Sequence, residues 1–387
     1  MKKTQSLRKI LALLGFLGIV FLLSQCKTKQ QSKLQNGTWR AELQREDGKQ
    51  VIFNFKLTDS ANQKVIYITN ANASLRVDSI KIKKDSIFIQ MPFFGSHFNA
   101  KITQEGTLEG SWIKEYGSKK EEMPFIAIPN DSTRIPAYEK ANGNIDGTWA
   151  TTFGTGENQR KAIGIFQQEG NRVTGTFLTP VGDYRYLQGV ISGDTLKLSG
   201  FDGCHALFFT AQLDSSQKKL SNGLMYSINS NPRSWLASKR KYDSLPKAYA
   251  VKNIPQGSVK ADFSLKDFRT GKEVSINDST YDGKVVVIQI LGSWCPNCMD
   301  ETRYLAPYYK KNKDKGVELI GVAFERTADF QESKQALNSF FTHFDINYPV
   351  LYAGVSYSDP KLTEKVFPNL PVDIHVFPTT IFIDKEG

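Results

Sequence analysis

The chain has 387 residues, which is too long for one ordinary domain, and its 40% hydrophobic and 12% aromatic content can fill more than one buried core. The formal net charge of +11 does not indicate nucleic-acid binding, because the basic residues are interspersed with acidic ones and form no stripe with interleaved aromatic residues. We therefore expect a multidomain protein with a solvated basic surface and no nucleic-acid partner.

Residues 1–26 have the pattern of an export signal. A basic start precedes an apolar run that ends at Leu23 and is too short to span a bilayer comfortably. The end of this segment resembles a bacterial lipobox, although Gln25 departs from the usual small residue before the cysteine. This resemblance implies lipid attachment at Cys26, a polar tether over 27–35, and a periplasm-facing protein of the cell envelope that is anchored to a membrane.

Residues 36–128 alternate apolar and polar side chains in short runs that are separated by turn residues. This alternation predicts an antiparallel meander with one buried face, and no helical period of useful length interrupts it. The clearest runs are 51–55, 65–68, 80–82, 86–89 and 98–102.

A second region of the same kind covers residues 145–241, after a linker-like segment at 129–144. It repeats the first region with an offset of about 110 residues, since Trp39 and Trp149 each end a Gly-Thr-Trp triplet. The repeat predicts a duplicated all-β unit, folded as two small barrels or sandwiches or as two halves of one larger sheet. The Gly-x-Trp openings also resemble the first strand of lipocalin-like barrels.

The β units offer two possible sites. Cys204 and His205 suggest a metal site. His97 occupies the position equivalent to His205 in the first repeat and is not shown to be adjacent to it, so the ligands are too few. We therefore expect a buried thiol beside a strand histidine. Aromatic residues could line a ligand site in the mouth of a barrel, although core and rim packing is the favoured interpretation. The aromatic candidates are Trp39, Trp149, Phe93, Phe94, Tyr184 and Tyr186.

After a second linker at 242–260, the pattern changes to alternating strands and helices, which predicts an α/β domain over 258–387. Residues 285–291 form a near-continuous apolar run, as in a strand that is buried on both faces. The other expected elements are a hairpin near 269–272, helices over 296–311 and 329–344, a helical turn over 361–366, and strands over 317–324, 348–352 and 379–384.

Cys295 and Cys298 form a Cys-x-x-Cys between the apolar strand and the following helix. This position places the first sulfur at the helix N-terminus, where unpaired amides and the helix dipole favour a thiolate. The second sulfur lies one turn further on, close enough to attack a mixed disulfide. The alternative is half of a zinc site, but the chain has no second such pair, so we predict dithiol redox chemistry without a metal or other cofactor.

Residues 261–387 resemble the thioredoxin-fold thiol-disulfide oxidoreductases of the membrane-tethered TlpA and ResA type. The resemblance implies an enzyme that acts on protein disulfides and receives electrons from a membrane thiol donor. Four motifs match: Asp-Phe-Ser-Leu at 262–265, Gly-Lys-Val-Val at 283–286, Trp-Cys-x-x-Cys at 294–298, and Phe-Pro-Thr-Thr-Ile-Phe-Ile-Asp at 377–384.

The same resemblance assigns roles to individual residues. Cys295 would be the exposed nucleophile and Cys298 the resolving thiol. Pro378 would be a cis-proline lying against the dithiol, and Glu301 would manage the proton of Cys298; an exposed helix residue is an equally weighted interpretation of Glu301. The residues flanking the active site would be Trp294 and Phe377.

Several features depart from the family pattern. Gln289 occupies the place of a buried aspartate, an unusual Pro-Asn dipeptide separates the cysteines, and the chain ends at the turn after 379–384, as in a domain truncated at its edge.

A peroxiredoxin-like peroxidase is disfavoured, because its cysteine normally lies in a different, Pro/Thr-rich context. The functional alternative is a binding lipoprotein in which the β units carry the function and the thioredoxin-like domain is accessory.

Overall fold

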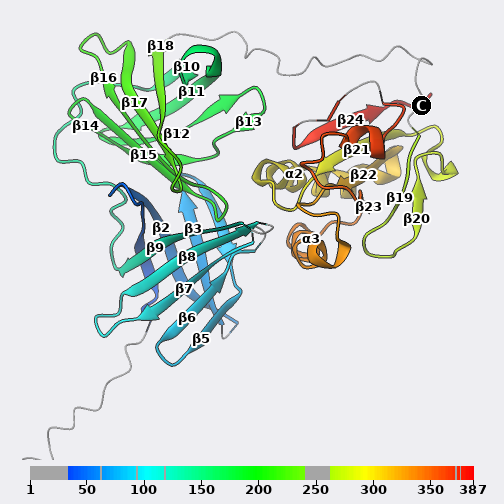
Figure 1. The fold of residues 1–387 in the computed structure, drawn as a ribbon, viewed down its shortest axis with the longest axis horizontal. Coiled ribbons are helices and arrows are strands. Elements are labelled where there is room, and N and C mark those ends of the chain that lie inside the picture. Colours follow the sequence, from blue (N-terminus) through cyan, green and yellow to red (C-terminus); the bar gives the residue numbers. More distant parts are fainter. Residues whose placement is uncertain are drawn as a thin grey trace, which may run out of the picture.

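The computed structural model contains two β units and one α/β domain (Figure 1). The predicted export signal with Cys26, the aromatic residues Phe93 and Phe94, and the predicted linker 242–260 lie outside the described residues. The structure describes residues 34–61, 63–92, 95–116, 119–239, 262–370, 373–374 and 376–387.

The first β unit is an antiparallel sheet of nine strands, in which the alternating residues expected from the sequence face a common core. Its strands are β1 (Gly37–Gln44), β2 (Gln50–Ser60), β3 (Gln63–Asn70), β4 (Ala73–Val77), β5 (Ile80–Lys83), β6 (Ser86–Gln90), β7 (Ser96–Ile102), β8 (Leu108–Tyr116) and β9 (Lys119–Pro129). The order is β4-β3-β2-β1-β9-β8-β7-β6-β5, so the two edge strands, β4 and β5, follow one another in the sequence. The sheet curls so that these edges approach without pairing, and this curled sheet is called the first barrel below.

The second β unit closes completely, because β11 pairs with both β10 and β12 and β10 pairs with β18. The result is a barrel to which the short strand β13 is added beside β12. Its strands are β10 (Gly147–Phe153), β11 (Arg160–Glu169), β12 (Arg172–Thr179), β13 (Gly182–Asp183), β14 (Leu187–Ser192), β15 (Thr195–Phe201), β16 (Ala206–Leu213), β17 (Lys219–Ser227) and β18 (Arg233–Lys239). The two units are therefore separate sheets, and the interpretation as halves of one sheet is wrong.

The duplication extends to individual hydrogen bonds. The indole of Trp39 donates to the Gln35 carbonyl at 3.0 Å, and that of Trp149 donates to the Ile145 carbonyl at 2.7 Å, in both cases four residues earlier. Both rings are fully buried in the cores of their units. These two tryptophans are therefore core residues and do not line a ligand site at the barrel mouth.

Segment 129–144, which the sequence suggested to be a linker, is largely exposed but buries Arg134 and Ile135. Arg134 in this segment is buried, and its guanidinium donates to Ser199 Oγ at 3.0 Å, Asn70 Oδ1 at 2.6 Å and the Thr69 carbonyl at 2.9 Å. Burial lowers the pKa of Arg134 to about 9, so the side chain still carries its charge at neutral pH. One cation thus connects a strand of each barrel.

Apolar contacts join the barrels at the same place. Phe201, at the end of β15 in the second barrel, is buried in the core of the first, where its ring stacks on Phe53 with centroids 4.3 Å apart. Ser199 Oγ also donates to the Ile52 carbonyl of β2 at 2.6 Å. The two barrels consequently pack as one body rather than as units on a loose tether.

The C-terminal domain contains every element expected from the sequence, with bounds that differ by at most two residues. Its central sheet has the order β23-β22-β21-β24, in which β22 is parallel and β24 antiparallel to β21. The elements are a hairpin of β19 (Ser264–Lys266) and β20 (Glu273–Ser275), then β21 (Val285–Leu291), α2 (Pro296–Asn312), β22 (Val317–Ala323), α3 (Phe330–Phe344), β23 (Val350–Tyr352), α4 (Leu362–Val366) and β24 (Thr379–Ile383).

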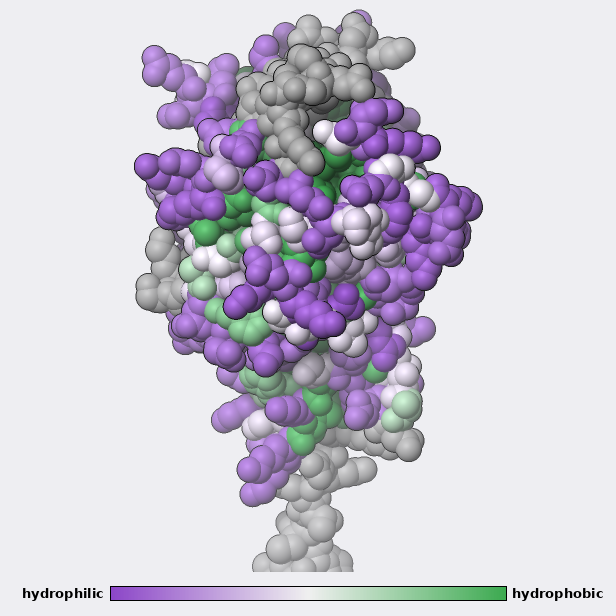
Figure 2. Space-filling model, turned by 90° about the vertical axis from the view of Figure 1, so that its right-hand side faces the viewer, coloured by the Kyte–Doolittle hydropathy of each residue, from purple (hydrophilic) through white to green (hydrophobic). Residues whose placement is uncertain are grey.

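Both faces of this sheet are covered, which explains the continuous apolar run of β21. Val287 and Leu291 pack in one cluster with residues of α2 and α3, whereas Val286 and Ile288 pack in a second cluster with residues of α4. The side of the domain that points away from the barrels is mainly hydrophilic (Figure 2). Within the described part of the chain, the helices are too short or too polar to span a bilayer.

Candidate functional site

The Cys-x-x-Cys lies at the start of α2, directly after the buried strand β21. Cys295 is the N-cap residue, Pro296 begins the helix, and Cys295 and Cys298 form a disulfide with their Cα atoms 5.2 Å apart. The Cys298 amide donates to Cys295 Sγ at 3.1 Å. When the pair is reduced, this amide and the positive end of the helix dipole favour a thiolate on Cys295.

The segment before β24 forms the opposite side of the site. The Phe377–Pro378 peptide bond is cis, and the Phe377 carbonyl oxygen lies 3.5 Å from Cys295 Sγ. Trp294 packs against Phe377 and Tyr357, with ring centroids 5.3 Å and 4.2 Å apart. The structure thus brings Trp294, Phe377 and Pro378 together around the first sulfur.

Glu301 is partly buried one turn after Cys298 and is held on both sides. Its carboxylate accepts from Gln289 Nε2 at 2.8 Å and from Thr380 Oγ1 at 2.5 Å. Gln289 also donates to the hydroxyl of Thr302, which in turn donates to the Cys298 carbonyl at 2.7 Å. Glu301 is therefore fixed between β21 and β24 behind the dithiol rather than exposed on the helix surface.

The sequence analysis missed Glu325, a buried carboxyl group below the active-site turn. It is the second residue after β22 and accepts from the Ser293 amide at 2.8 Å and from the Ser293 hydroxyl at 2.7 Å. Burial raises the pKa of Glu325, and the two hydrogen bonds from Ser293 counteract this shift only in part. Glu325 therefore supports the residues that lead into Trp294 and Cys295. The signal in the sequence was a single acid after an apolar strand, which is weak without the fold.

The raised pKa of Glu325 predicts how stability depends on pH. As the pH rises above the ordinary glutamate pKa of 4.5, the unfolded chain loses this proton before the folded chain does. This carboxyl therefore makes the free energy of unfolding fall as the pH rises, until the higher pKa of the folded state is passed. Glu325→Gln keeps an acceptor for Ser293 but cannot titrate. Between pH 4 and pH 8, the denaturation midpoint of E325Q should rise relative to that of the wild type as the pH rises. A pH-independent difference between the two proteins would contradict this.

The second barrel covers the dithiol. Cys295, which the family resemblance implied to be exposed, is only 4% exposed, and a loop of this barrel contacts the start of α2 beside it. Arg185, just after β13, donates to the Pro296 carbonyl at 3.1 Å and pairs with Asp300 at 3.2 Å. The site is thus shared between parts of the chain that lie far apart in sequence.

A cavity of about 500 Å³ remains between the barrels and the dithiol. Cys295 lines it from the C-terminal domain, and Cys204 and His205 line it from the second barrel. The Cys204 thiol is buried and free, and burial raises its pKa to about 11, so it stays protonated at neutral pH. Among the described residues, no cluster of three or more His, Cys, Asp or Glu side chains could hold a metal ion.

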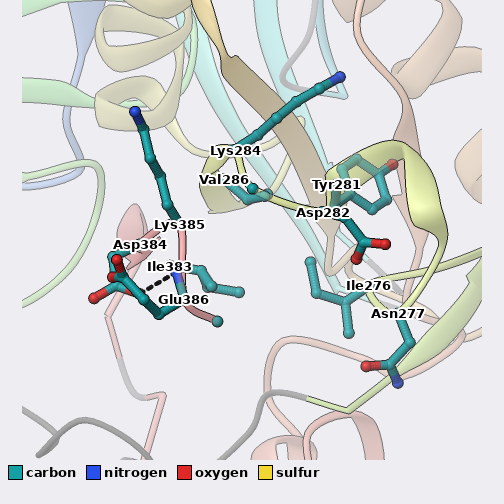
Figure 3. A pocket seen from close by; sticks show the side chains of 12 residues that line it. Ile276, Asn277, Tyr281, Asp282, Lys284, Val286, Ile383, Asp384, Lys385 and Glu386 are labelled. Atoms are coloured by element: carbon teal, nitrogen blue, oxygen red, sulfur yellow. Dashed lines mark hydrogen bonds between the residues drawn. The ribbon is translucent and has the colours of Figure 1, made fainter.

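A smaller cavity of about 110 Å³ lies at the other end of β21, beside Val286 and away from the dithiol. Ile276 and Ile383 line opposite sides of it, and Lys284 and Lys385 extend outward (Figure 3). It contains no cysteine and none of the site residues expected from the sequence. The cavity next to Cys295 is therefore the better candidate for a functional site.

Comparison with known proteins gives matches for the C-terminal third of the chain. Residues 257–387 match the model of the AhpC/TSA family. Thiol-disulfide oxidoreductase ResA of Bacillus subtilis (strain 168) is 32% identical over 135 residues, which cover 35% of this chain and 65% of the relative. The protein of the same name from Bacillus thuringiensis subsp. konkukian (strain 97-27) is 30% identical over 117 residues, or 30% of this chain and 57% of the relative.

Solved structures match the same region. The thioredoxin domain of a thiol-disulfide oxidoreductase from Bacteroides vulgatus is 27% identical, with a TM-score of 0.26, and the match covers 35% of this chain and 84% of that one. A putative protein disulfide isomerase from Bacteroides thetaiotaomicron is 25% identical, with a TM-score of 0.27, over 36% of this chain and 76% of that one. The chain spans less than two thirds of the length of the two curated relatives named above.

Proposed function

Because residues 257–387 form a thioredoxin-fold domain similar to the ResA thiol-disulfide oxidoreductases, we propose that the chain reduces disulfide bonds in protein substrates. The observation that carries the proposal is the Cys295–Cys298 disulfide at the N-terminus of α2, with the carbonyl oxygen of Phe377 at 3.5 Å from the first sulfur. A dithiol that closes into a disulfide within one helical turn can accept and deliver a pair of electrons.

The proposed reaction has two exchange steps. In the reduced protein, the Cys295 thiolate attacks one sulfur of the substrate disulfide and forms a mixed disulfide, and the other substrate sulfur leaves as a thiolate. Cys298 then loses its proton and attacks Cys295 Sγ, which releases the second substrate thiolate and closes the Cys295–Cys298 disulfide. The substrate has gained two electrons, and protons from the surroundings complete its thiols.

We propose that Glu301 assists the second step. It lies one helical turn beyond Cys298, and its hydrogen bonds to Gln289 and Thr380 fix the carboxylate between two strands. A carboxylate in this place can accept the proton that Cys298 must lose before it attacks. Re-reduction of the disulfide would come from a membrane thiol donor.

The protein is proposed to act in the cell envelope on the periplasmic side. Support comes from the sequence of residues 1–26, which has a basic start, an apolar run and a lipobox-like end. In this scheme Cys26 carries a lipid anchor and residues 27–35 are the tether. The domains would be two β units over 36–128 and 145–241, followed by the oxidoreductase domain over 258–387.

The proposal is tested by trapping the intermediate. Cys298→Ser removes the resolving thiol, so substrates should remain joined to Cys295 as mixed disulfides, because hydroxyl groups do not take part in the exchange. The variant is expressed in the native envelope, quenched with acid, alkylated, and analysed by non-reducing electrophoresis and mass spectrometry. The control replaces both cysteines by serine. Adducts that are absent, or equally abundant in the control, would contradict the proposed function.

A further inference from the structure

Cys204 is a buried thiol that the two proposed exchange steps do not use. It lies in the turn between β15 and β16 of the second barrel, is 4% exposed and forms no disulfide. The chain has four cysteines, and three of them, Cys204, Cys295 and Cys298, lie within the described residues. The chemistry open to Cys204 depends on where it lies relative to the other two.

Two observations place Cys204 beside the first sulfur of the dithiol. Cys204 and Cys295 line the same cavity of about 500 Å³, one from the second barrel and the other from the C-terminal domain. Cys204 also belongs to the cluster of buried side chains that contains Cys295 and Cys298, and the other buried members described for this cluster all come from the C-terminal domain. Helix α2 faces the β units, as this packing requires (Figure 1). The three sulfur atoms therefore form one group across the boundary between barrel and domain.

The turn that carries Cys204 is held by hydrogen bonds from both barrels. Asp202 accepts from the Cys204 amide at 2.8 Å and from the His205 amide at 2.7 Å. Lys114 of β8, in the first barrel, donates to the Cys204 carbonyl at 2.8 Å. A thiol on a turn held in this way stays beside Cys295 and loses little conformational freedom when it reacts.

From this arrangement we propose that Cys204 is a second resolving thiol, which attacks Cys295 Sγ in the mixed disulfide with substrate and forms a Cys204–Cys295 disulfide between barrel and domain. This inference rests on the proposed function, because it needs that mixed disulfide. The bond between Cys295 and the substrate sulfur breaks as the new bond forms. The substrate sulfur leaves with the electron pair and takes up a proton, while Cys204 gives its own proton to the solvent. The substrate gains two electrons, as it does when Cys298 resolves the intermediate.

Cys204 should act more slowly than Cys298. Burial raises the pKa of Cys204 to about 11, so at pH 7 roughly one molecule in ten thousand carries the reactive thiolate. Its position beside Cys295 in the folded chain offsets part of this cost. Cys298 therefore remains the main resolving thiol, and the substrate adducts of Cys298→Ser should accumulate first and then decay slowly through Cys204.

The test uses the full-length Cys298→Ser protein, which is reduced, freed of reductant and mixed with the chromogenic disulfide DTNB. Reaction of Cys295 releases one equivalent of thionitrobenzoate, and attack by Cys204 on the mixed disulfide should then release a second equivalent in a slower phase. Free thiols are alkylated and the protein is digested with trypsin without reductant. Mass spectrometry should find a cross-link between peptide 198–218, which contains Cys204, and peptide 285–303, which contains Cys295.

The matched variant adds Cys204→Ala to Cys298→Ser. It should lack the slower phase and the cross-link, and its adduct on Cys295 should persist about tenfold longer or more. In the native envelope, its substrate adducts should likewise outlast those of Cys298→Ser alone. Urea denaturation checks that the added substitution leaves the protein folded, and the cross-link itself is measured with Cys204 in place.

The outcomes separate this inference from the proposed function. Release of the first equivalent alone, without a cross-link, would overturn the role of Cys204 and leave that of Cys295 in place. A cross-link that forms no faster in the folded protein than in urea would overturn it as well, because the fold would then not hold the two thiols together. So would a slower phase that persists in Cys295→Ser/Cys298→Ser, since Cys204 would be reacting with the probe directly. No reaction of Cys295 with the probe would overturn both proposals.

Discussion

Replacing Cys295 with serine should lower disulfide reduction to the rate of the uncatalysed background. A serine hydroxyl is not ionised at neutral pH and cannot form a mixed disulfide, so neither exchange step can begin. The effect is measured as the turnover of a fluorescent disulfide substrate with dithiothreitol as the electron source.

Two controls make this result specific. Lys310→Gln, on the same helix but away from the sulfur atoms, should retain the wild-type rate. In dithiothreitol, where the wild type also lacks the disulfide, unchanged denaturation of the Cys295→Ser protein should show that its fold is intact. If Cys295→Ser retained more than about a tenth of the wild-type rate, a loss of less than about 1.4 kcal/mol of transition-state stabilisation, Cys295 could not be the nucleophile.

Arg134→Leu should destabilise the paired barrels by about 2–5 kcal/mol. The variant leaves the acceptors Thr69 O, Asn70 Oδ1 and Ser199 Oγ without the donors that the guanidinium supplies, and unsatisfied buried polar groups cost roughly 1–3 kcal/mol each. Some relaxation and the apolar contacts of leucine offset part of this cost.

The measurement is urea denaturation followed by tryptophan fluorescence, since Trp39, Trp112 and Trp149 are all buried in the barrels. The midpoint should fall clearly in Arg134→Leu. The control is Arg76→Gln, which changes an exposed arginine on β4 that pairs with Asp78 and should leave the midpoint unchanged. Equal midpoints for Arg134→Leu and the wild type would show that the buried cation does not stabilise the contact between the barrels.

Local patterns in the sequence predicted the elements of this fold well. Alternation along β2 and β7 and the continuous apolar run of β21 were visible because each depends on the side-chain period of a single strand. The Gly-Thr-Trp repeat likewise predicted the duplicated all-β region. These features need no knowledge of which strands pair.

Features that depend on distant contacts could not be predicted in this way. Closure of the second barrel requires β11 to pair with β12 as well as β10, and no period within a single strand contains that pairing. The core packing favoured for the aromatic residues is confirmed for Trp39 and Trp149. Arg134 was missed because a polar, proline-containing segment has the composition of a linker whether or not it is packed. Arg185 reaches the dithiol from a loop more than a hundred residues earlier, and no local period contains that information.

The contact between β13 and the dipeptide inside the Cys-x-x-Cys has a thermodynamic consequence. Gly182 has a φ of +142°, and a Cβ atom added to it would collide with the side-chain amide of Asn297, so the barrel backbone touches the residues between the two sulfurs. Suppose that α2 binds the barrel with different affinity when the dithiol is oxidised and when it is reduced. Thermodynamic reciprocity then requires the barrel to change the midpoint potential of the dithiol by the same free energy, about 30 mV for each tenfold difference in affinity. The midpoint potential of this dithiol is then a property of the assembled chain, and a substrate that weakens the contact between the barrel and α2 changes that potential.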